Sequence, residues 1–286
     1  GELTQQFLLP QGTRLPSVVD TTTQSVNAIA RFNDHHLPAF ARIQNWLQQL
    51  LHDPPLQAAL FRRQTTDPLQ VILQVDSAIS LVPGEQEDLH KWLITLLPAS
   101  NVQFAPRFGL ADIDSWLDNP GLMGALLVLS VCIRPTITDG EGEAAVALLL
   151  HIGEEEGVYS HARVRIHRPE QSKDAEALYA SAMQSLVWGK TRAEDIASLW
   201  LAGMGTGNTT QSLLSKNKLR FPRAEANAQI IDIDMKTGRT GVVSPWLAAA
   251  LAAGHSGTLP FSQLIMSSPG GGMPWWTVIH TGNDTS

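Results

Sequence analysis

Three glycine-rich motifs follow one another in the second half of the chain and hold the residue types best suited to chemistry. They are Asp139-Gly140-Glu141-Gly142-Glu143, then Met204-Gly205-Thr206-Gly207-Asn208, then Lys236-Thr237-Gly238-Arg239-Thr240-Gly241. Glycine lets the backbone turn sharply and approach a reacting group closely, so such loops are typical of catalytic sites. The residue that opens the second loop is a methionine, however, and a thioether neither donates nor shuttles a proton. This combination indicates a catalytic loop that has lost its chemistry.

Cys132 is the only cysteine, so the sequence excludes an internal disulfide and a thiolate metal cluster. It lies inside the apolar run from Leu126 to Ile133, where a cysteine usually behaves as a small buried apolar side chain. A reactive thiolate needs partial exposure and nearby positive charge. The sequence therefore predicts a core position for Cys132 rather than a nucleophilic role.

Other candidates for catalysis or metal binding are weaker. The segment Gly254-His255-Ser256-Gly257-Thr258 is similar to a hydrolase nucleophile elbow, but Thr258 replaces the closing glycine and a helix precedes it where a strand is needed. Asp232 and Asp234, two apart on one predicted strand face, could serve acid–base work, and an edge or loop position explains them equally well. The histidines lack the spacing of a ligand pair, so we expect neither a metal nor another cofactor.

The elements that would position these residues alternate between strands and helices. Apolar runs and period-two alternation predict strands at 69–75, 125–133, 144–151, 162–167, 198–201, 229–233 and 275–280, with a helix left open for the alanine-containing 144–151. Helical spacing and breaker residues predict helices over 26–51 with a division at Pro38, and at 55–63, 85–97, 174–187, 192–198, 209–215 and 245–253. This alternation predicts an α/β fold with a largely buried sheet. No internal repeat is visible in the sequence.

In order and spacing, the three glycine-rich motifs resemble the C-terminal half of the β-ketoacyl synthase branch of the thiolase-like superfamily. That family has a Gly-Glu-Gly-Ala-Ala loop before an apolar strand, a His-Gly-Thr-Gly-Thr loop, and a Lys-x-x-x-Gly-His segment before an alanine-rich helix. The resemblance covers Asp139 to Ala253 and fails upstream. It implies a thiolase-like, ketosynthase-like layered domain of sheets and helices.

The resemblance also implies which positions correspond to catalytic groups. Met204 stands at the first catalytic histidine, Gly241 stands near the second, and Lys236 matches the family's lysine. The remaining loop positions are matched by Gly205, Thr206 and Gly207. The family's cysteine nucleophile has no counterpart, because Cys132 is too close to the Gly-Glu loop and lacks the small-residue elbow after it. With the nucleophile and both histidines absent, we expect no catalytic residues and no ketosynthase activity.

The domain organisation combines this degenerate half with an unrelated beginning. We expect an extended arm at 1–25, a helical N-terminal region at 26–66 and the thiolase-like α/β domain at 67–286. Together with the segment Ser160–Pro169, this combination resembles the type VI secretion lipase adaptor family. That resemblance implies a non-catalytic adaptor or chaperone that binds an effector lipase and delivers it to the secretion spike.

Trp275 and Trp276 are adjacent on a predicted strand, so their side chains point to opposite faces. We expect one of them to be exposed and to belong to a partner-binding surface. Two alternatives to the adaptor stay open. One is an acyl-thioester enzyme of the thiolase superfamily with relocated catalytic groups, such as Asp232, Asp234 or a histidine. The other is an inactive partner subunit of a ketosynthase-like enzyme.

Composition and charge narrow the function classes further. The 286 residues are 43% hydrophobic and 16% charged, which is ordinary for a globular protein with a substantial core. A formal net charge of −7 argues against a nucleic-acid partner. No apolar run approaches the roughly 20 residues of a membrane span, and no signal segment opens the chain, so we expect a bacterial cytoplasmic protein. An upstream anchor or signal stays open, because Gly1 resembles the start of a trimmed chain.

Overall fold

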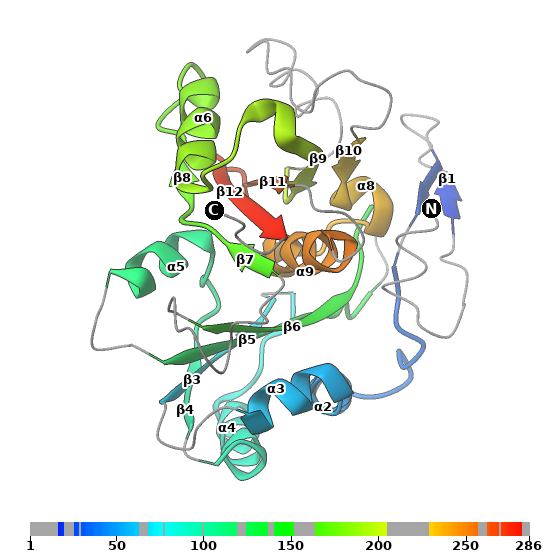
Figure 1. Cartoon of the computed structure of the whole chain (residues 1–286). Coiled ribbons are helices and arrows are strands. Elements are labelled where there is room, and N and C mark those ends of the chain that lie inside the picture. Colours follow the sequence, from blue (N-terminus) through cyan, green and yellow to red (C-terminus); the bar gives the residue numbers. More distant parts are fainter. Residues whose placement is uncertain are drawn as a thin grey trace.

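Two mixed β-sheets form the centre of the molecule, with helices between and outside them (Figure 1). A computed structural model of the chain describes residues 17–19, 26–28, 30–62, 68–76, 78–98, 100–118, 124–136, 140–151, 164–204, 229–256, 262–268 and 270–281. The first sheet contains, in spatial order, β4 (Ser100–Phe104), β3 (Leu69–Val75), β5 (Ala125–Cys132) and β6 (Ala144–His151). The second contains β10 (Gln229–Asp232), β9 (Ile196–Ala202), β11 (Ser262–Ser267), β12 (Trp275–Thr281) and β7 (Val164–Ile166), and β8 (Glu170–Gln171) also pairs with β12. The predicted α/β architecture is confirmed.

The two sheets repeat one topology. In the first, β3 is parallel to both β4 and β5, and β6 is antiparallel to β5. In the second, β9 is parallel to both β10 and β11, and β12 is antiparallel to β11. No repeat is visible in the sequence because a buried strand requires apolar side chains of suitable size, not particular residues.

Helix α9 (Ser244–Ser256) lies between the two sheets, as Figure 1 shows. Its buried Trp246 and Ala248 belong to one apolar cluster with Leu126 of the first sheet and with Trp200 and Ile265 of the second. The shorter helix α5 (Leu110–Leu117) contributes to the same cluster. The alanines of α9 have little bulk, so they allow the sheets to approach the helix closely.

The outer faces of both sheets are also covered. Helices α2 (Ala39–Leu51) and α4 (Pro83–Leu96) pack on the first sheet, beside α3 (Pro54–Arg62), and α6 (Leu178–Trp188) packs on the second. Strand β5 is buried along its whole length, as expected of a strand covered on two faces. The result is a five-layered arrangement in which helix and sheet layers alternate.

Two of the predicted elements are wrong. Val26–Ala28 is not helical but forms strand β2, which pairs antiparallel with β1 (Ser17–Val19), and the helix begins only at Ala39. Pro38 is the N-cap of that helix, because proline cannot donate to a preceding turn. In place of the predicted helix at 192–198, the structure has a single 3-10 turn at Ala193–Asp195, and β9 begins at Ile196. Ile196 is β-branched, and such residues favour strands over helices.

Other sequence predictions have mixed outcomes. The segment 144–151 is strand β6, which excludes the helix that the sequence left open for it. The predicted helix at 209–215 lies outside the described residues. The division into an arm at 1–25, a helical region at 26–66 and a domain at 67–286 stays a prediction. Among the described residues, no helix combines the length and apolar character that a membrane crossing requires.

Candidate functional site

The first and third glycine-rich motifs meet in the structure and pair through their backbones. Glu141 and Arg239 form a parallel β-bridge, and the amide of Arg239 donates to the carbonyl of Gly140 at 2.8 Å. Gly142 and Gly238 make this approach possible. A Cβ on Gly238, which has a φ of 79°, would lie 2.7 Å from the amide nitrogen of Gly142. Both positions therefore require glycine for packing, whatever chemistry the motifs perform.

A carboxylate fills the space beside Gly241, which the resemblance places near the second catalytic histidine. Gly241 has a φ of 55° and begins the 3-10 helix Gly241–Val243. A Cβ on it would overlap Oδ2 of Asp76, the residue that directly follows β3, and would lie 3.0 Å from its Cγ. The same carboxylate accepts hydrogen bonds from the amides of Ala78 at 3.1 Å and Val242 at 3.2 Å. Asp76 thus fills the space that a side chain at position 241 would need.

Arg134 neutralises this carboxylate. Its Nη1 donates to Oδ1 of Asp76 at 2.8 Å, and the two side chains are only 9% and 7% exposed. Nη2 of Arg134 donates to the carbonyl of Arg239 at 3.3 Å, and Nε lies 3.9 Å from a carboxylate oxygen of Glu141. A buried ion pair repays its desolvation only when further hydrogen bonds satisfy its partners. Asp76 and the two Nη atoms of Arg134 have such bonds, whereas Nε of Arg134 is buried without one among the described residues.

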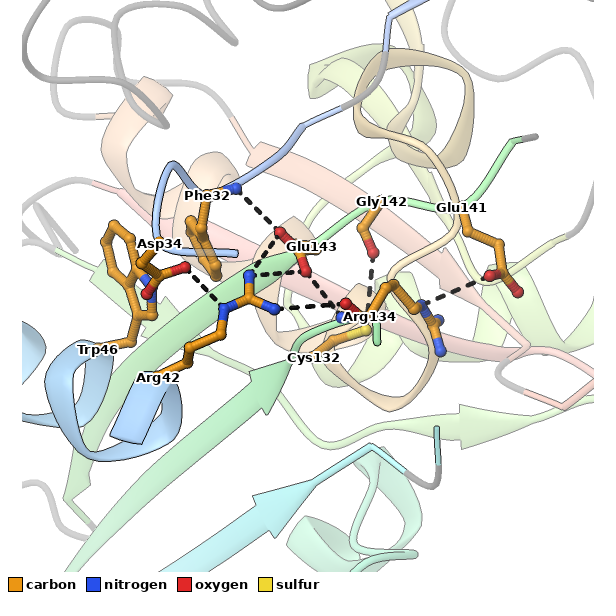
Figure 2. Close-up of polar contacts among 9 residues, drawn as sticks. All are labelled: Phe32, Asp34, Arg42, Trp46, Cys132, Arg134, Glu141, Gly142 and Glu143. Carbon is orange, nitrogen blue, oxygen red and sulfur yellow. Dashed lines mark hydrogen bonds and ion pairs between the residues drawn. The ribbon is translucent and has the colours of Figure 1, made fainter. Parts of the chain in front are cut away.

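A second buried ion pair, between Arg42 and Glu143, lies beside Arg134, as Figure 2 shows. The carboxylate of Glu143 accepts hydrogen bonds from Nη2 of Arg42 at 2.9 and 3.0 Å and from the amide of Arg134 at 2.7 Å. Arg42 also donates to Asp34 at 2.7 Å, and the indole of Trp46 donates to the same carboxylate at 2.7 Å. Burial alone lowers the pKa of Arg42, but hydrogen bonds to Asp34 and Glu143 outweigh it, and the pKa is raised overall. We refer to Asp34, Arg42, Asp76, Arg134, Glu141 and Glu143 as the charged cluster.

The segment Ala30–Asp34 forms hydrogen bonds to both the first and the third glycine-rich motif. The amide of Ala30 donates to the carbonyl of Thr237 at 2.8 Å, and its carbonyl accepts from the amide of Glu143 at 2.9 Å. The amide of Phe32 donates to the Glu143 carboxylate at 2.9 Å, and its ring stacks on Trp46. The charged cluster therefore joins the N-terminal region, both motifs and the ends of β3 and β5.

Cys132 occupies the predicted buried position, beside the charged cluster. Its thiol lies 3.6 Å from the carbonyl of Gly142 and donates to it. Burial strongly raises the pKa of this thiol, and the nearby charge of Asp76 raises it further. The thiolate is therefore disfavoured at neutral pH, which is the reverse of what a nucleophilic cysteine requires.

Met204 is not brought into the charged cluster. It lies two residues after the end of β9, is half-buried and packs against the apolar cluster beneath α6 that includes Met266 and Trp276. Lys236 is exposed on the short helix α8 (Ile233–Thr237). Gly205, Thr206 and Gly207 lie outside the described residues, so their arrangement relative to Gly241 stays a prediction.

Two further expectations about site residues are corrected. Asp232 and Asp234 do not share a strand face: Asp232 caps α8 by accepting from the amide of Met235 at 3.0 Å, and Asp234 lies buried in its first turn. Neither adjacent tryptophan is exposed, because β12 is covered on both faces. Trp276 is fully buried and donates to Ser172 at 2.8 Å, while Trp275 is half-buried against the central cluster. A partner-binding role for Trp275 or Trp276 stays a prediction.

The charged cluster was missed at the sequence level, although part of its signal is visible there. Asp76 and Arg134 stand just after apolar strands, where parallel neighbours bring their ends together. Arg42 lies on the buried face of an otherwise amphipathic helix, which is unusual for arginine. In the described part of the chain, no group of three or more His, Cys, Asp or Glu side chains could hold a metal ion.

The arrangement of layers and strands is that of the thiolase-like fold. Ketosynthase twelve from the bacillaene polyketide synthase of Bacillus amyloliquefaciens matches with a TM-score of 0.58 and 12% identity, over 90% of this chain and 65% of that one. The acyltransferase ChlB3 matches with a TM-score of 0.57 and 14% identity, over 90% and 87%. β-Ketoacyl-[acyl carrier protein] synthase III from Thermus thermophilus matches with a TM-score of 0.50 and 14% identity, over 90% and 88%.

These similarities confirm the predicted fold. They cover nine tenths of the chain, whereas the resemblance of the sequence motifs covers only residues 139–253. Neither a protein-family model nor a curated protein matches the sequence. At 12–14% identity the structural neighbours define the fold alone. Function must therefore be argued from the residues of the site.

Proposed function

We propose that this chain is a non-catalytic adaptor that uses a thiolase-like fold to bind a protein partner. The partner that we propose is an effector lipase of the type VI secretion system, which the adaptor would deliver to the secretion spike. The choice of partner rests on the sequence resemblance. The non-catalytic part rests on one structural observation, the ion pair between Asp76 and Arg134 at Gly241.

Condensation at a thioester needs hydrogen-bond donors aimed at the carbonyl oxygen, where negative charge develops. At Gly241 the nearest side chain is instead the carboxylate of Asp76, which only accepts hydrogen bonds and already does so from Arg134 and Val242. It offers no hydrogen-bond donor to an oxyanion, and its own charge is already paired with Arg134. An ion pair of this kind serves to hold the first and third glycine-rich motifs together.

The thiol of Cys132 supports the same conclusion. A nucleophilic cysteine is activated by an adjacent base or cation and must reach its substrate. The described surroundings of Cys132 bury it completely and raise its pKa, and its hydrogen-bond partner is a backbone carbonyl. Binding, rather than turnover, is therefore the function that this geometry supports best.

A second candidate is an acyl-thioester enzyme with relocated catalytic groups. It is favoured by the structural neighbours, which include ketosynthases, and by Asp232, whose pKa is raised by burial. A raised pKa makes a carboxyl group a better candidate for general acid catalysis. This candidate requires measurable consumption of an acyl-thioester.

Affinity capture from the native bacterial host tests the adaptor proposal. We expect the tagged chain to enrich a lipase, and the two purified proteins to form a stoichiometric complex by calorimetry. Trp275→Ala tests the predicted partner surface, with Tyr179→Ala on α6 as a matched aromatic control. Enrichment of a ketosynthase-like chain would instead support an inactive subunit. Recovery of the bait alone, together with thioester cleavage, would overturn the proposal.

A further inference from the structure

Helix α6 lies on the outside of the second sheet, and none of its 11 residues is charged (Figure 1). Its inner side packs on the sheet through Leu178, Ala182 and Leu186. Its outer side presents two neighbouring rows at four-residue spacing, which are Tyr179, Met183 and Val187 in the first row and Ala180, Gln184 and Trp188 in the second. A helix that lacks charge on all sides is typical of a buried element rather than of one at the surface.

The outer face of α6 is nevertheless exposed in the single chain. Tyr179, Val187 and Trp188 are 51%, 63% and 43% exposed. The helices that cover the first sheet differ, because α2 and α4 present amide and charged side chains there, such as Gln48 and Glu87. Exposed apolar side chains gathered on one charge-free helix indicate a surface that binds another protein.

Opposite charges flank α6 at equal distances from its centre. Glu176 and Lys190 are both exposed, and neither has an ion-pair partner in the described part of the chain. Met183 lies seven residues from each of them along the sequence. Seven residues are close to two helical turns, so Met183 and these two charges follow one line along the outer face. We refer to Glu176 and Lys190 as the flanking charges.

The other charges near the ends of α6 lie outside this pattern. Asp174 is engaged before the helix, where its carboxylate accepts a hydrogen bond from the amide of Ala177 at 2.8 Å. Arg192 pairs with Asp195 at 3.1 Å after the helix. Lys173 lies one residue further from the helix than Asp174. The flanking charges are therefore the ones that stand at matched positions on either side of the apolar face.

We propose that a second copy of this chain binds to the outer face of α6, with the two helices antiparallel and a two-fold axis at Met183. A two-fold contact places residue i of one protomer opposite residue j of the other, and j opposite i. With Met183 on the axis, Tyr179 lies opposite Val187 of the partner subunit. Glu176 likewise lies opposite Lys190 of the partner subunit, so each dimer gains two ion pairs at the rim of an apolar contact.

This match about Met183 favours a second copy over a different protein, because an antiparallel copy supplies the complementary charge at both ends. A helix of this length spans about 16 Å, so the contact is at the small end of specific interfaces, and we expect a dissociation constant in the micromolar range. The dimer goes beyond the proposed function. Its surface is separate from Trp275, which packs towards the central cluster, whereas the adjacent Trp276 packs beneath α6.

Sedimentation velocity of the full chain from about 1 to 200 µM tests this proposal. We expect the wild type to show a reversible, concentration-dependent equilibrium between monomer and dimer. Val187→Glu places a charge in the apolar contact and should weaken the dimer at least tenfold. Phe61→Glu is the matched control, because Phe61 on α3 is 91% exposed but lies outside this face, and it should leave the equilibrium unchanged.

Reversal of the flanking charges tests the antiparallel arrangement. Glu176→Lys and Lys190→Glu each place like charges opposite one another across the axis and should each weaken the dimer about fivefold at low salt. The double variant restores opposite charges and should dimerise as the wild type does. Urea unfolding of each variant checks that the fold is intact, since both positions are exposed.

The proposal is overturned if the wild type is monomeric throughout, if Val187→Glu dimerises as the wild type does, or if the double variant fails to recover the dimer. A monomeric wild type whose capture of an effector is lost in Val187→Glu would assign this face to the effector instead. The two proposals fail separately: Tyr179→Ala should weaken the dimer and keep effector capture, and Trp275→Ala should do the reverse.

Discussion

The carboxylate of Asp76 occupies the volume in which a side chain at position 241 would begin. The two residues come from different halves of the chain, and only the absence of a Cβ at Gly241 lets them lie so close. The Asp76–Arg134 pair then fixes the third glycine-rich motif to the ends of β3 and β5. Gly241, which the sequence resemblance places near a catalytic position, thus packs closely against Asp76 in this molecule.

Gly241→Ala is expected to lower the free energy of unfolding by about 2–4 kcal/mol, because it combines a left-handed φ with an overlap on Asp76. Gly270→Ala is the matched control: its φ is 82°, but nothing lies within 4 Å of the added Cβ. The control should lose only about 1 kcal/mol, the cost of the left-handed backbone alone. Urea unfolding of both variants measures the difference, and equal losses would show that Asp76 does not fill this space.

The Arg42–Glu143 pair should behave as a buried ion pair. Arg42→Met removes the cation from the buried carboxylates of Asp34 and Glu143 and is expected to cost about 3–5 kcal/mol of unfolding free energy. Glu143→Met should cost less, because Arg42 keeps its ion pair with Asp34. The double variant should lose clearly less than the sum of the single losses, and a double-mutant cycle by chemical denaturation measures this coupling. The exposed Glu87–Lys91 pair provides the control and should show little coupling. Additive losses at Arg42 and Glu143 would contradict the buried network.

Cys132 should resist alkylation in the folded protein. Its raised pKa and complete burial leave almost no accessible thiolate at pH 8. Iodoacetamide labelling followed by mass spectrometry should therefore detect negligible modification of the native chain and complete modification in 6 M guanidinium. Rapid labelling of the native protein would require an exposed, reactive thiol and would contradict the structure.

Stability should depend on the ionisation of Asp232. Burial raises the pKa of this carboxyl in the folded state above its ordinary value of 3.8, while hydrogen bonds from the amides of Met235 and Asp234 oppose the shift. The stability that the bound proton contributes is fully present below pH 3.8 and is lost as the pH rises through the folded-state pKa. Asp232→Asn keeps a capping side chain and does not ionise.

Urea unfolding of wild type and Asp232→Asn between pH 3.5 and 7 tests this dependence. The variant should gain stability relative to the wild type as the pH rises from about 3.8, and the difference should level off once Asp232 is ionised. A difference that stays constant over this range would mean that burial does not perturb the carboxyl.

The sequence predicts the buried strands and helices of this fold better than the contacts that join its segments. The apolar run of β5 and the alanine-rich α9 are recognisable because burial on two faces demands a continuous apolar pattern. Val26–Ala28 was predicted as helix because its spacing is compatible with both states, and pairing with β1 decides between them. The sequence does not predict the charged cluster, because its pairs, Arg42 with Glu143 and Asp76 with Arg134, become neighbours only through the tertiary fold.

The most direct test of the central claim is the rate at which the purified chain consumes acyl-thioesters, including acetyl and malonyl thioesters of coenzyme A and of an acyl carrier protein. Because Asp76 fills the space beside Gly241 and Cys132 is buried as a thiol, we predict a rate equal to that of buffer alone. A rate well above buffer that is lost on substitution of Asp232, and retained on substitution of Cys132, would contradict the non-catalytic account and establish an enzyme with relocated groups.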